Sequence, residues 1–523
     1  MLFDTRKFHK RGVIMAKNLV YDIHDKPKFG NLIIFAIQQL LAILAATIAV
    51  PTIIGLPTQI PAAILGAGVG TLVYQLFTKF RSPVFLGSSF AFLSSLGVAL
   101  AYGYYGILLG SLVAGLVYVV IALIVKLIGT DWVNKLMPPV IIGPTVTIIG
   151  LSLAGSAMGD IVKANADSVN GGYNLVGLVC GVVTFLTVII CSTQKRYTMP
   201  KLIPFILGII AGYAVASVFT VIGLVANIEY LQIINWEPVV KNFVNEEGAF
   251  QGIKAFFSLP KISIVEAIKE VVTGTLSQEI IDATPIKDAV TNEVIGSYAK
   301  IIDIGGAVEV VVAFLPVALV VFAEHIADHK NLSTIIDRDL IKDPGLSRTL
   351  LGDGVGSMMG TAFGICPNTT YGESVGCVAI TKNASVITIT TTAFMCILLS
   401  FFSPLMAVLQ TIPSCVMGGV CLTLYGFIAV SGLKMFKDLD LNENKNLFVV
   451  SAILIAGIGG LSIQIPYALA ENGAVAKTIQ VTAIATALIL GIIANAILTK
   501  VEKSKLGKEA DAPKTETEDG DAE

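Results

Sequence analysis

Two acidic residues, Glu324 and Glu373, lie in or beside long apolar stretches of this 523-residue chain. An ionisable side chain at membrane depth is energetically expensive, so a chain that keeps one there is expected to use it. Glu373 lies in the polar run 366–376, where Pro367 and Gly372 break the helical pattern. Broken backbone at membrane depth is tolerated where it lines a cavity enclosed by protein. Together these features predict a substrate site inside a transporter.

The residues around Glu373 have the chemistry to bind a flat, polar ring. If a short helix begins in the run 369–373, its first N–H groups have no intrahelical acceptor and carry positive partial charge. A planar ligand can accept from them through carbonyl groups. Glu373 can accept from ring N–H groups when it is ionised and donate when it is neutral. The alternative is that Thr369 and Glu373 only cap their own helix, as such residues often do.

A second polar break, the run 82–90, precedes another short apolar segment. Gly87 allows close approach of the backbone. Ser88 and Ser89 can satisfy the groups of a broken helix or contact a ligand, and Phe90 can stack on a flat ring. Each residue also has an ordinary role, because a serine in an apolar helix usually bonds to its own backbone and a phenylalanine usually packs.

Glu324 belongs to a polar cluster that closes an apolar run. If the helix continues through the cluster, Glu324 lies inside the membrane, and Asp328, four residues on, shares its face. Desolvation and a nearby like charge both favour a protonated carboxyl, so this pair can bind and release a proton during transport. His325 points elsewhere and is expected to support helix packing. His329 and Lys330 are expected at an interfacial helix end.

The composition is that of a protein with many membrane-spanning helices. Hydrophobic residues make up 54% of the chain and charged residues 14%, with a mean hydropathy of +0.81, whereas soluble domains are about a quarter charged. The net charge of −2 indicates no nucleic-acid partner, and the seven cysteines lack metal-ligand spacing. The first thirty residues lack a short apolar core before a cleavage site, so we expect no removable signal peptide.

Fourteen apolar segments follow one another along the chain, and each is predicted to form a helix. They lie near residues 31–51, 60–78, 84–100, 105–126, 138–155, 173–191, 202–223, 308–325, 345–363, 371–381, 384–403, 411–431, 447–465 and 475–498. The Lys and Arg residues of the short loops fall on one side if both termini are cytoplasmic, which fits an even number of spans. We therefore predict an all-α polytopic membrane protein.

Five parts are predicted along the chain, and the polar breaks recur at corresponding places in two of them. The parts are a cytoplasmic N-terminal segment (1–30), a first seven-helix repeat (31–223), an external insertion (224–307), a second seven-helix repeat (308–498) and a disordered cytoplasmic tail (499–523). Because seven is odd, the two repeats must have opposite topology. Paired breaks in inverted repeats point to a binding site near the membrane midplane.

The insertion 224–307 carries six lysines, no arginine and eleven acidic residues, a net charge of −5 that fits an external location. It contains a segment with the pattern of an amphipathic helix, Ile262–Val272. We expect a solvated cap, and capture of substrate is the alternative.

The polar runs resemble the motifs of the nucleobase–ascorbate transporter family and, within it, those of the bacterial uracil permeases. The resemblance rests on Pro367-Asn368-Thr369-Thr370-Tyr371-Gly372-Glu373, Glu324-His325-Ile326 and Gly87-Ser88-Ser89-Phe90. Pro138-Pro139, Asp343-Pro344-Gly345-Leu346 and Met417-Gly418-Gly419-Val420 are also similar. The likeness covers roughly residues 30–225 and 305–500 in order. Glutamate at position 373, where purine and ascorbate branches commonly carry glutamine, favours uracil.

The resemblance implies fourteen helices in two inverted repeats, with short strands before the broken third and tenth helices and with separate core and gate domains. It also implies a homodimeric symporter in the cell membrane that imports uracil with protons and uses no other cofactor or metal. By likeness, Glu324 and Glu373 hold the ring N–H groups, Gly372 and Phe90 offer backbone N–H groups, and Tyr371, Tyr425 and Ser89 shape the pocket. Glu324 is also the coupling residue by likeness, whereas the part of Asp328 in proton coupling is expected from its i, i+4 spacing and not from the resemblance.

The sequence departs from the family pattern at two places in the motifs. Ala327 and Asp328 stand where a Gly-His pair is usual, which puts a histidine-assisted proton step in doubt, and Gln38-Gln39 replaces Gln-His. Three alternatives remain open: a xanthine or other purine permease of the same family, an anion channel or exchanger on the related fold, and an enzyme. We find no nucleophile–base pair, metal motif or phosphate loop that favours an enzyme.

Overall fold

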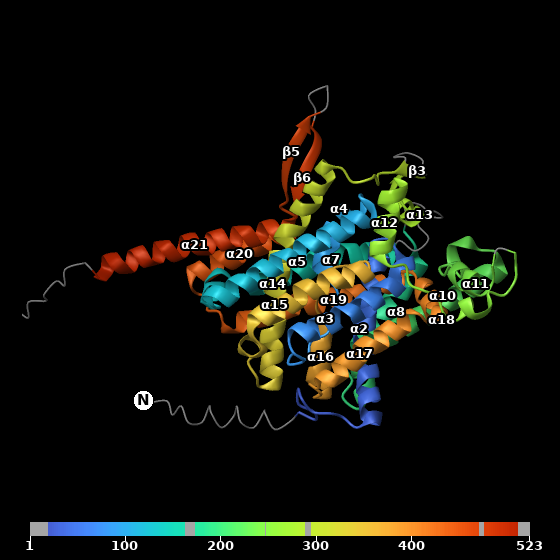
Figure 1. The fold of residues 1–523 in the computed structure, drawn as a ribbon, viewed down its shortest axis with the longest axis horizontal. Coiled ribbons are helices and arrows are strands. Elements are labelled where there is room, and N and C mark those ends of the chain that lie inside the picture. Colours follow the sequence, from blue (N-terminus) through green and yellow to red (C-terminus); the bar gives the residue numbers. More distant parts are fainter. Residues whose placement is uncertain (1–18, 163–172, 246, 288–293, 470–474, 511–523) are drawn as a thin grey trace, which may run out of the picture.

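The computed structural model describes residues 19–162, 173–245, 247–287, 294–469 and 475–510, and Figure 1 shows their arrangement. The described chain is mainly helical and also contains three two-stranded sheets. Among the described residues, nine helical segments are long and apolar enough to cross a membrane. They contain α2 (Phe29–Ile53), α3 (Ile60–Phe77), α5 (Gly103–Ile128), α7 (Pro139–Val162), α8 (Leu175–Thr193), α10 (Pro204–Ala226), α14 (Ile304–Ile336), α19 (Ser414–Lys434) and α21 (Ala483–Ala510).

The remaining predicted segments form helices that are shorter or more polar. They are the 3₁₀ turn η3 (Phe90–Phe92) with α4 (Leu93–Leu100), α15 (Leu346–Phe363), α16 (Gly372–Thr381), α17 (Val386–Ser400) and α20 (Asn444–Ile458). Each of the fourteen predicted apolar segments therefore contains a described helix. Short helices α6 (Asp131–Leu136), α9 (Thr198–Leu202) and α18 (Ser403–Gln410) lie in the connections.

Local sequence explains where several helices begin. Pro139 and Pro204 are the first residues of α7 and α10, where a missing N–H costs nothing and the fixed φ suits a helix. The side chain of Asn174 precedes α8 and accepts from two N–H groups of its first turn. Asp303 caps α14 in the same way and accepts from the N–H group of Gly306 at 2.6 Å.

Strands β1 (Leu86–Ser88) and β4 (Asn368–Thr370) come from distant parts of the chain and pair antiparallel. Beyond the paired strands, the N–H group of Ser89 donates to the carbonyl of Pro367 at 2.9 Å, and that of Tyr371 donates to Phe85 at 3.1 Å. These bonds satisfy backbone that would otherwise be unpaired where two helices are interrupted. The predicted short strands before these two helices are confirmed.

Close helix packing holds β4 in place. Helix α3 crosses α15 so closely that a Cβ on Gly66 would lie 2.2 Å from the carbonyl oxygen of Gly360, so this position requires glycine. The side chain of Asn368 reaches the same crossing and donates to the carbonyl of Gly66 at 3.0 Å. Strand β4 is therefore tied both to β1 and to the α3–α15 pair.

Short helices lie along the described part of the insertion 224–307, at one end of the bundle (Figure 1). They are η5 (Glu229–Leu231), α11 (Glu237–Phe243), η6 (Gly252–Ala255), α12 (Ser263–Thr273) and α13 (Gln278–Ala283), followed by strands β2 (Pro285–Lys287) and β3 (Val294–Ser297). The predicted amphipathic helix is confirmed as α12.

The structure corrects the sequence prediction near the last two helices. Strands β5 (Ile463–Leu469) and β6 (Val475–Val481) pair as an antiparallel hairpin that projects from the bundle (Figure 1), where helical segments 447–465 and 475–498 were predicted. Alternating β-branched and polar residues, as in Thr478–Val481, favour a strand over a helix. Helix α21 then continues to Ala510, past the predicted boundary at residue 498, and residues 511–523 of the predicted tail lie outside the described part.

Candidate functional site

The candidate site lies where β4 and the start of α16 meet the middle of α14. Helix α14 runs without a break through Glu324 and Asp328, which confirms that the helix continues through this polar cluster. The hydroxyl of Thr370 in β4 donates to the Asp328 carboxylate at 2.7 Å. Asp328 is buried, with 6% of its surface exposed, and Glu324 is partly exposed.

Glu324, Asp328 and Glu373 lie within electrostatic range of one another. The carboxyl of Glu324 is close enough to those of Asp328 and Glu373 for direct electrostatic interaction. Within the described residues, Glu324 Oε2 is buried and has no hydrogen-bond partner. Because this oxygen has no hydrogen-bond partner, Glu324 is suited to accept a hydrogen bond from a ligand N–H group or to bind a proton.

Open space borders Asp328 at the start of α16. Gly372 is exposed, and the one described atom found within 4.0 Å of a Cβ built on it is Asp328 Oδ1. Gly372 and Glu373 are the first two residues of α16, where helix geometry leaves N–H groups without intrahelical acceptors. The Glu373 carboxyl also interacts with its own backbone N–H, as the capping alternative requires. A carboxylate has two oxygens, so capping leaves one free for a ligand.

Tyr371 is buried and packs against β1. Its hydroxyl donates to the carbonyl of Ser88 at 3.0 Å and lies 3.5 Å from the hydroxyl of Thr47. A Cβ on Gly87 would come within 2.3 Å of the Tyr371 ring, so glycine is needed for this contact. Ser89 is fully buried. In the described part of the chain the hydroxyls of Ser88, Ser89 and Thr369 are buried without a partner.

Phe90 and Tyr425 meet edge to face, with ring centroids 5.4 Å apart. Both side chains are buried. Phe90 begins η3, so its N–H group has no acceptor within its own turn. The contact joins α19 to the broken segment that follows β1, as the predicted pocket-shaping role of Tyr425 requires.

His325 and His329 support the back of α14. His325 Nδ1 lies 2.7 Å from the Asp353 carboxylate and Nε2 lies 3.0 Å from the Thr349 hydroxyl, so its expected supporting role agrees with its geometry. The expectation that His329 lies at a helix end is wrong, because α14 continues to Ile336. His329 is fully buried, and its Nε2 lies 2.8 Å from the Tyr74 hydroxyl. Lys330 is partly buried.

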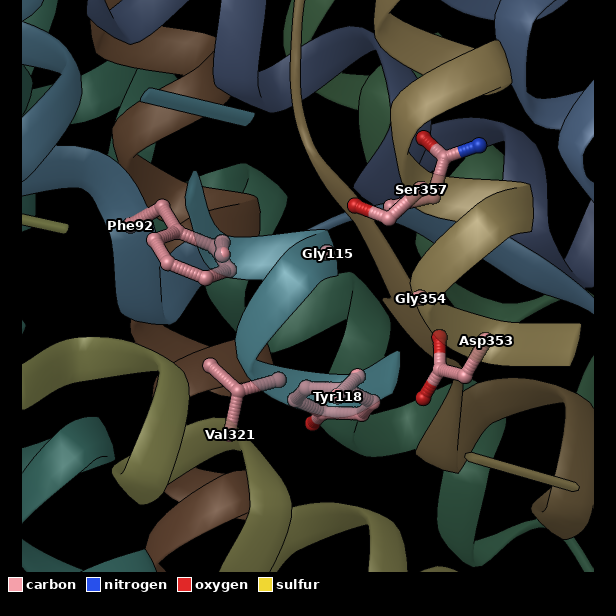
Figure 2. Close-up of a pocket in the computed structure, with 9 residues that line it drawn as sticks. Phe92, Gly115, Tyr118, Val321, Asp353, Gly354 and Ser357 are labelled. Atoms are coloured by element: carbon pink, nitrogen blue, oxygen red, sulfur yellow. The ribbon is translucent and has the colours of Figure 1, made fainter. Parts of the chain in front are cut away.

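Asp353 is the residue that the sequence interpretation missed. It is buried in α15 and pairs with His325. A small cavity of about 10 Å³ lies beside it, and Figure 2 shows Tyr118, Val321 and Ser357 around this cavity. The signal was available in the sequence, since Asp353 is an acid within a predicted apolar segment.

The two glutamines of α2 take different partners. Gln39 donates to the hydroxyl of Ser374 in α16 at 2.5 Å, and Gln38 donates to the sulfur of Met199 in α9 at 3.3 Å. Gln39 therefore fixes α16 near its first turn. Among the described residues, no group of three or more His, Cys, Asp or Glu side chains is arranged to hold a metal ion.

The sequence matches a known protein family. The profile of the Permease family matches residues 30–466, which is most of the chain. The chain belongs to the permease family. It is therefore a multi-pass protein of the cell membrane, and its family indicates a transporter.

Curated relatives match over nearly their whole length. A uracil permease of Bacillus caldolyticus is 35% identical over 92% of this chain and 94% of that protein. A uracil permease of Bacillus subtilis (strain 168) is 33% identical over 94% of this chain and 97% of that protein. A uracil permease of Escherichia coli (strain K12) is 30% identical over 88% of this chain and 92% of that protein.

Two solved structures share the fold at low sequence identity. The transmembrane domain of the cyanobacterial bicarbonate transporter BicA aligns with a TM-score of 0.51 and 13% identity, over 91% of this chain and all of that domain. The murine anion transporter Slc26a9 in its inward-facing state aligns with a TM-score of 0.57 and 9% identity, over 96% of this chain and 73% of that protein. These similarities show the fold alone and give no information about the substrate of this chain.

Proposed function

We propose that this permease imports uracil by proton symport and that the base binds beside Glu324 and Glu373. The observation that carries the proposal is the position of Asp328 Oδ1 beside the open space at Gly372, the first residue of α16, with Glu324 and Glu373 within electrostatic range of Asp328. The names of the similar proteins support uracil as the substrate.

The chemistry of uracil suits the groups gathered here. The ring carries two N–H donors and two carbonyl acceptors in one plane. The carboxylates of Glu324 and Glu373 accept from the N–H groups, and the backbone N–H groups of Gly372 and Phe90 donate to the carbonyls. Hydrogen bonds to charged groups contribute about 1.5–3 kcal/mol each, so two such bonds account for much of a micromolar affinity.

Proton coupling follows from the same acids. Three carboxyls within electrostatic range of one another cannot all remain ionised without cost, so we propose that one of them carries a proton in some step of transport. Glu324 is the proposed coupling residue because Oε2 has no partner among the described residues. Asp328 shares the proton with it, and the Thr370 hydroxyl holds Asp328 in place.

The proposal includes the finer architecture expected from the sequence. It comprises fourteen spans in two inverted repeats, core and gate domains that move against each other, both termini in the cytoplasm, and a homodimer. The pairing of β1 with β4, each before a short helix, supports the two-fold relation of the repeats. The contact between Phe90 and Tyr425 is the proposed meeting point of core and gate.

Uptake of radiolabelled uracil into proteoliposomes tests the function directly. Uptake that needs an inward proton gradient and collapses with a protonophore supports the proposal. Loss of uptake in both Glu324→Gln and Glu373→Gln supports the site, whereas uptake unaffected by both changes rejects it.

A purine permease of the same family is the second candidate, and the family match is the observation that favours it. Competition of uptake by xanthine but not by uracil would select it. An anion exchanger is disfavoured, although similar folds carry anions, because Asp328 beside the open space and two further acids within electrostatic range of it disfavour an anion.

A further inference from the structure

Helix α12 of the insertion has three chemically distinct faces. Ser263, Ala267 and Glu270 are buried against the bundle. Next to them lies a charged face, where Lys269 and Glu266 form a salt bridge of 2.6 Å. The third face is apolar and exposed, and it consists of Ile264, Val265, Ile268, Val271 and Val272.

This arrangement is inverted relative to a helix of a soluble domain. Such a helix turns its apolar stripe to the protein and its acids to water. In α12 the acid Glu270 is 3% exposed, whereas Ile268 is 58% exposed and Val272 is 79% exposed. Since successive residues turn by about 100°, the five apolar side chains form one continuous sector beside the charged one.

The contacts of α12 fix its depth relative to the bundle. The Glu270 carboxylate accepts from the N–H group of Tyr104, in the first turn of α5, at 2.9 Å. The hydroxyl of Ser263 donates to the carbonyl of Gly364, the residue that follows α15. Helix α12 therefore lies across the ends of α5 and α15, where a spanning helix leaves the membrane.

Apolar side chains are also exposed on elements that neighbour α12 in the fold or in the sequence. Helix α5 is a candidate span that exposes Leu112, Leu116 and Val120. The chain just before α12 exposes Phe257 and Leu259, and the ring of Phe257 contacts that of Phe402 after α17. A helix with an apolar and a charged face, lying at the end of a span, has the pattern of an interfacial helix.

We propose that α12 lies in the outer boundary of the bilayer, with Ile264, Ile268 and Val272 against lipid acyl chains and with Lys269 in water. The insertion is then a cap that rests on lipid along one edge, in contrast to the fully solvated cap expected from its charge. Its apolar edge and the lipid-facing side of α5 form one continuous surface.

Spin labels on neighbouring residues of α12 test this proposal. Ile268→Cys and Val272→Cys place a nitroxide on the apolar face, and the matched variants Lys269→Cys and Thr273→Cys place it on the other exposed face. The full chain is reconstituted in liposomes of phosphatidylcholine and phosphatidylglycerol. The native cysteines are buried except Cys191, which is partly buried, so the labelled parent chain gives the background.

The expected result is a contrast within one helix. Labels at positions 268 and 272 should relax several-fold more with oxygen, which concentrates in lipid, than with a water-soluble nickel chelate, and labels at 269 and 273 should show the reverse. Equal accessibility to nickel at all four positions would overturn the proposal. Protection of 268 and 272 from both reagents would also overturn it, because a protein partner would then cover the face. Uracil uptake by the same liposomes reports separately on the proposed function.

Discussion

Thr370 of strand β4 donates a hydrogen bond of 2.7 Å to Asp328 of helix α14. The other oxygen of Asp328, Oδ1, lies 4.0 Å from where a Cβ on Gly372 would be. The Asp328 carboxylate therefore bonds to strand β4 through one oxygen and faces the open space at the start of α16 with the other. We expect a change in the protonation of Asp328 to affect both the hydrogen bond to β4 and the binding of a ligand in that space.

Removing the Thr370 hydroxyl tests the importance of this link. Thr370→Val leaves the Asp328 carboxylate buried without its partner, a loss of about 1.5–3 kcal/mol for a bond to a charged group. We expect uracil uptake at neutral pH to fall by at least about tenfold and its pH optimum to move. Thr370→Ser keeps the hydroxyl and should keep both properties. The test is the pH profile of uracil uptake for both variants. A profile of Thr370→Val that matches the parent chain would show that the Thr370–Asp328 hydrogen bond does not influence transport.

The packing of Tyr371 on Gly87 gives a steric prediction. Gly87→Ala places a methyl group 2.3 Å from the Tyr371 ring, so Tyr371 must move and its bond to the Ser88 carbonyl is lost. Overpacking of this kind costs about 1–3 kcal/mol. We expect lower thermal stability and loss of uracil binding. Gly97→Ala is the control, because a Cβ there has no described atom within 4 Å, and it should behave like the parent chain.

Glu373 is expected to set affinity for the base. Glu373→Gln replaces a charged acceptor by a neutral amide, and the loss of about 1.5–3 kcal/mol weakens uracil binding by about 10- to 150-fold. Equilibrium binding of tritiated uracil to the purified protein measures this change. Glu247→Gln, an exposed position of the insertion, is the control and should leave affinity unchanged. Equal affinities for the two variants would remove Glu373 from the site.

Glu279 of α13 fastens the insertion to the bundle. It accepts from the side chains of Thr58, Gln59 and Tyr104 and pairs with Lys261 at 3.0 Å. Glu279→Gln should loosen this end of the insertion by about 2 kcal/mol, because hydrogen bonds to a charged acceptor are weakened. Faster hydrogen–deuterium exchange in residues 275–284 measures the effect. Asp282→Asn, at an exposed position of the same helix, should leave exchange unchanged.

The same residue gives a pH dependence with a defined sign. Burial acts to raise the pKa of Glu279, but hydrogen bonds from Tyr104, Thr58 and Lys261 outweigh it and leave the pKa below its usual value of 4.5. A carboxyl with a lowered pKa stabilises the folded state above its ordinary pKa, and this contribution is lost as pH falls through the lowered value. The protection factors of residues 275–284, which correct for the intrinsic pH dependence of exchange, should therefore fall on acidification below about pH 4.5 in the parent chain. Glu279→Gln should remove that fall.

The sequence predicted the elements of the site because strong local signals mark them. Pro367 and Gly372 on one side and Pro83 and Gly87 on the other interrupt apolar runs, and the structure places a strand before a short helix at each position. The i, i+4 spacing of Glu324 and Asp328 is visible without a structure, because a continuous helix puts them on one face.

Other features could not be predicted because they depend on tertiary contacts. The burial of His329 follows from its contact with Tyr74, which is 255 residues away in sequence. The alternation in residues 478–481 favours a strand, but the hairpin itself depends on the pairing of Ile463 with Val481 across it. The inward position of Glu270 likewise depends on the N–H group of Tyr104.

The most direct test of the central claim measures proton entry together with uracil entry. Liposomes that contain the purified chain and a trapped pH-sensitive dye receive uracil outside. We predict that uracil acidifies the lumen, that Glu324→Gln abolishes this acidification, and that chloride in place of uracil produces none. Uracil entry without acidification, or acidification that persists in Glu324→Gln, would contradict the account.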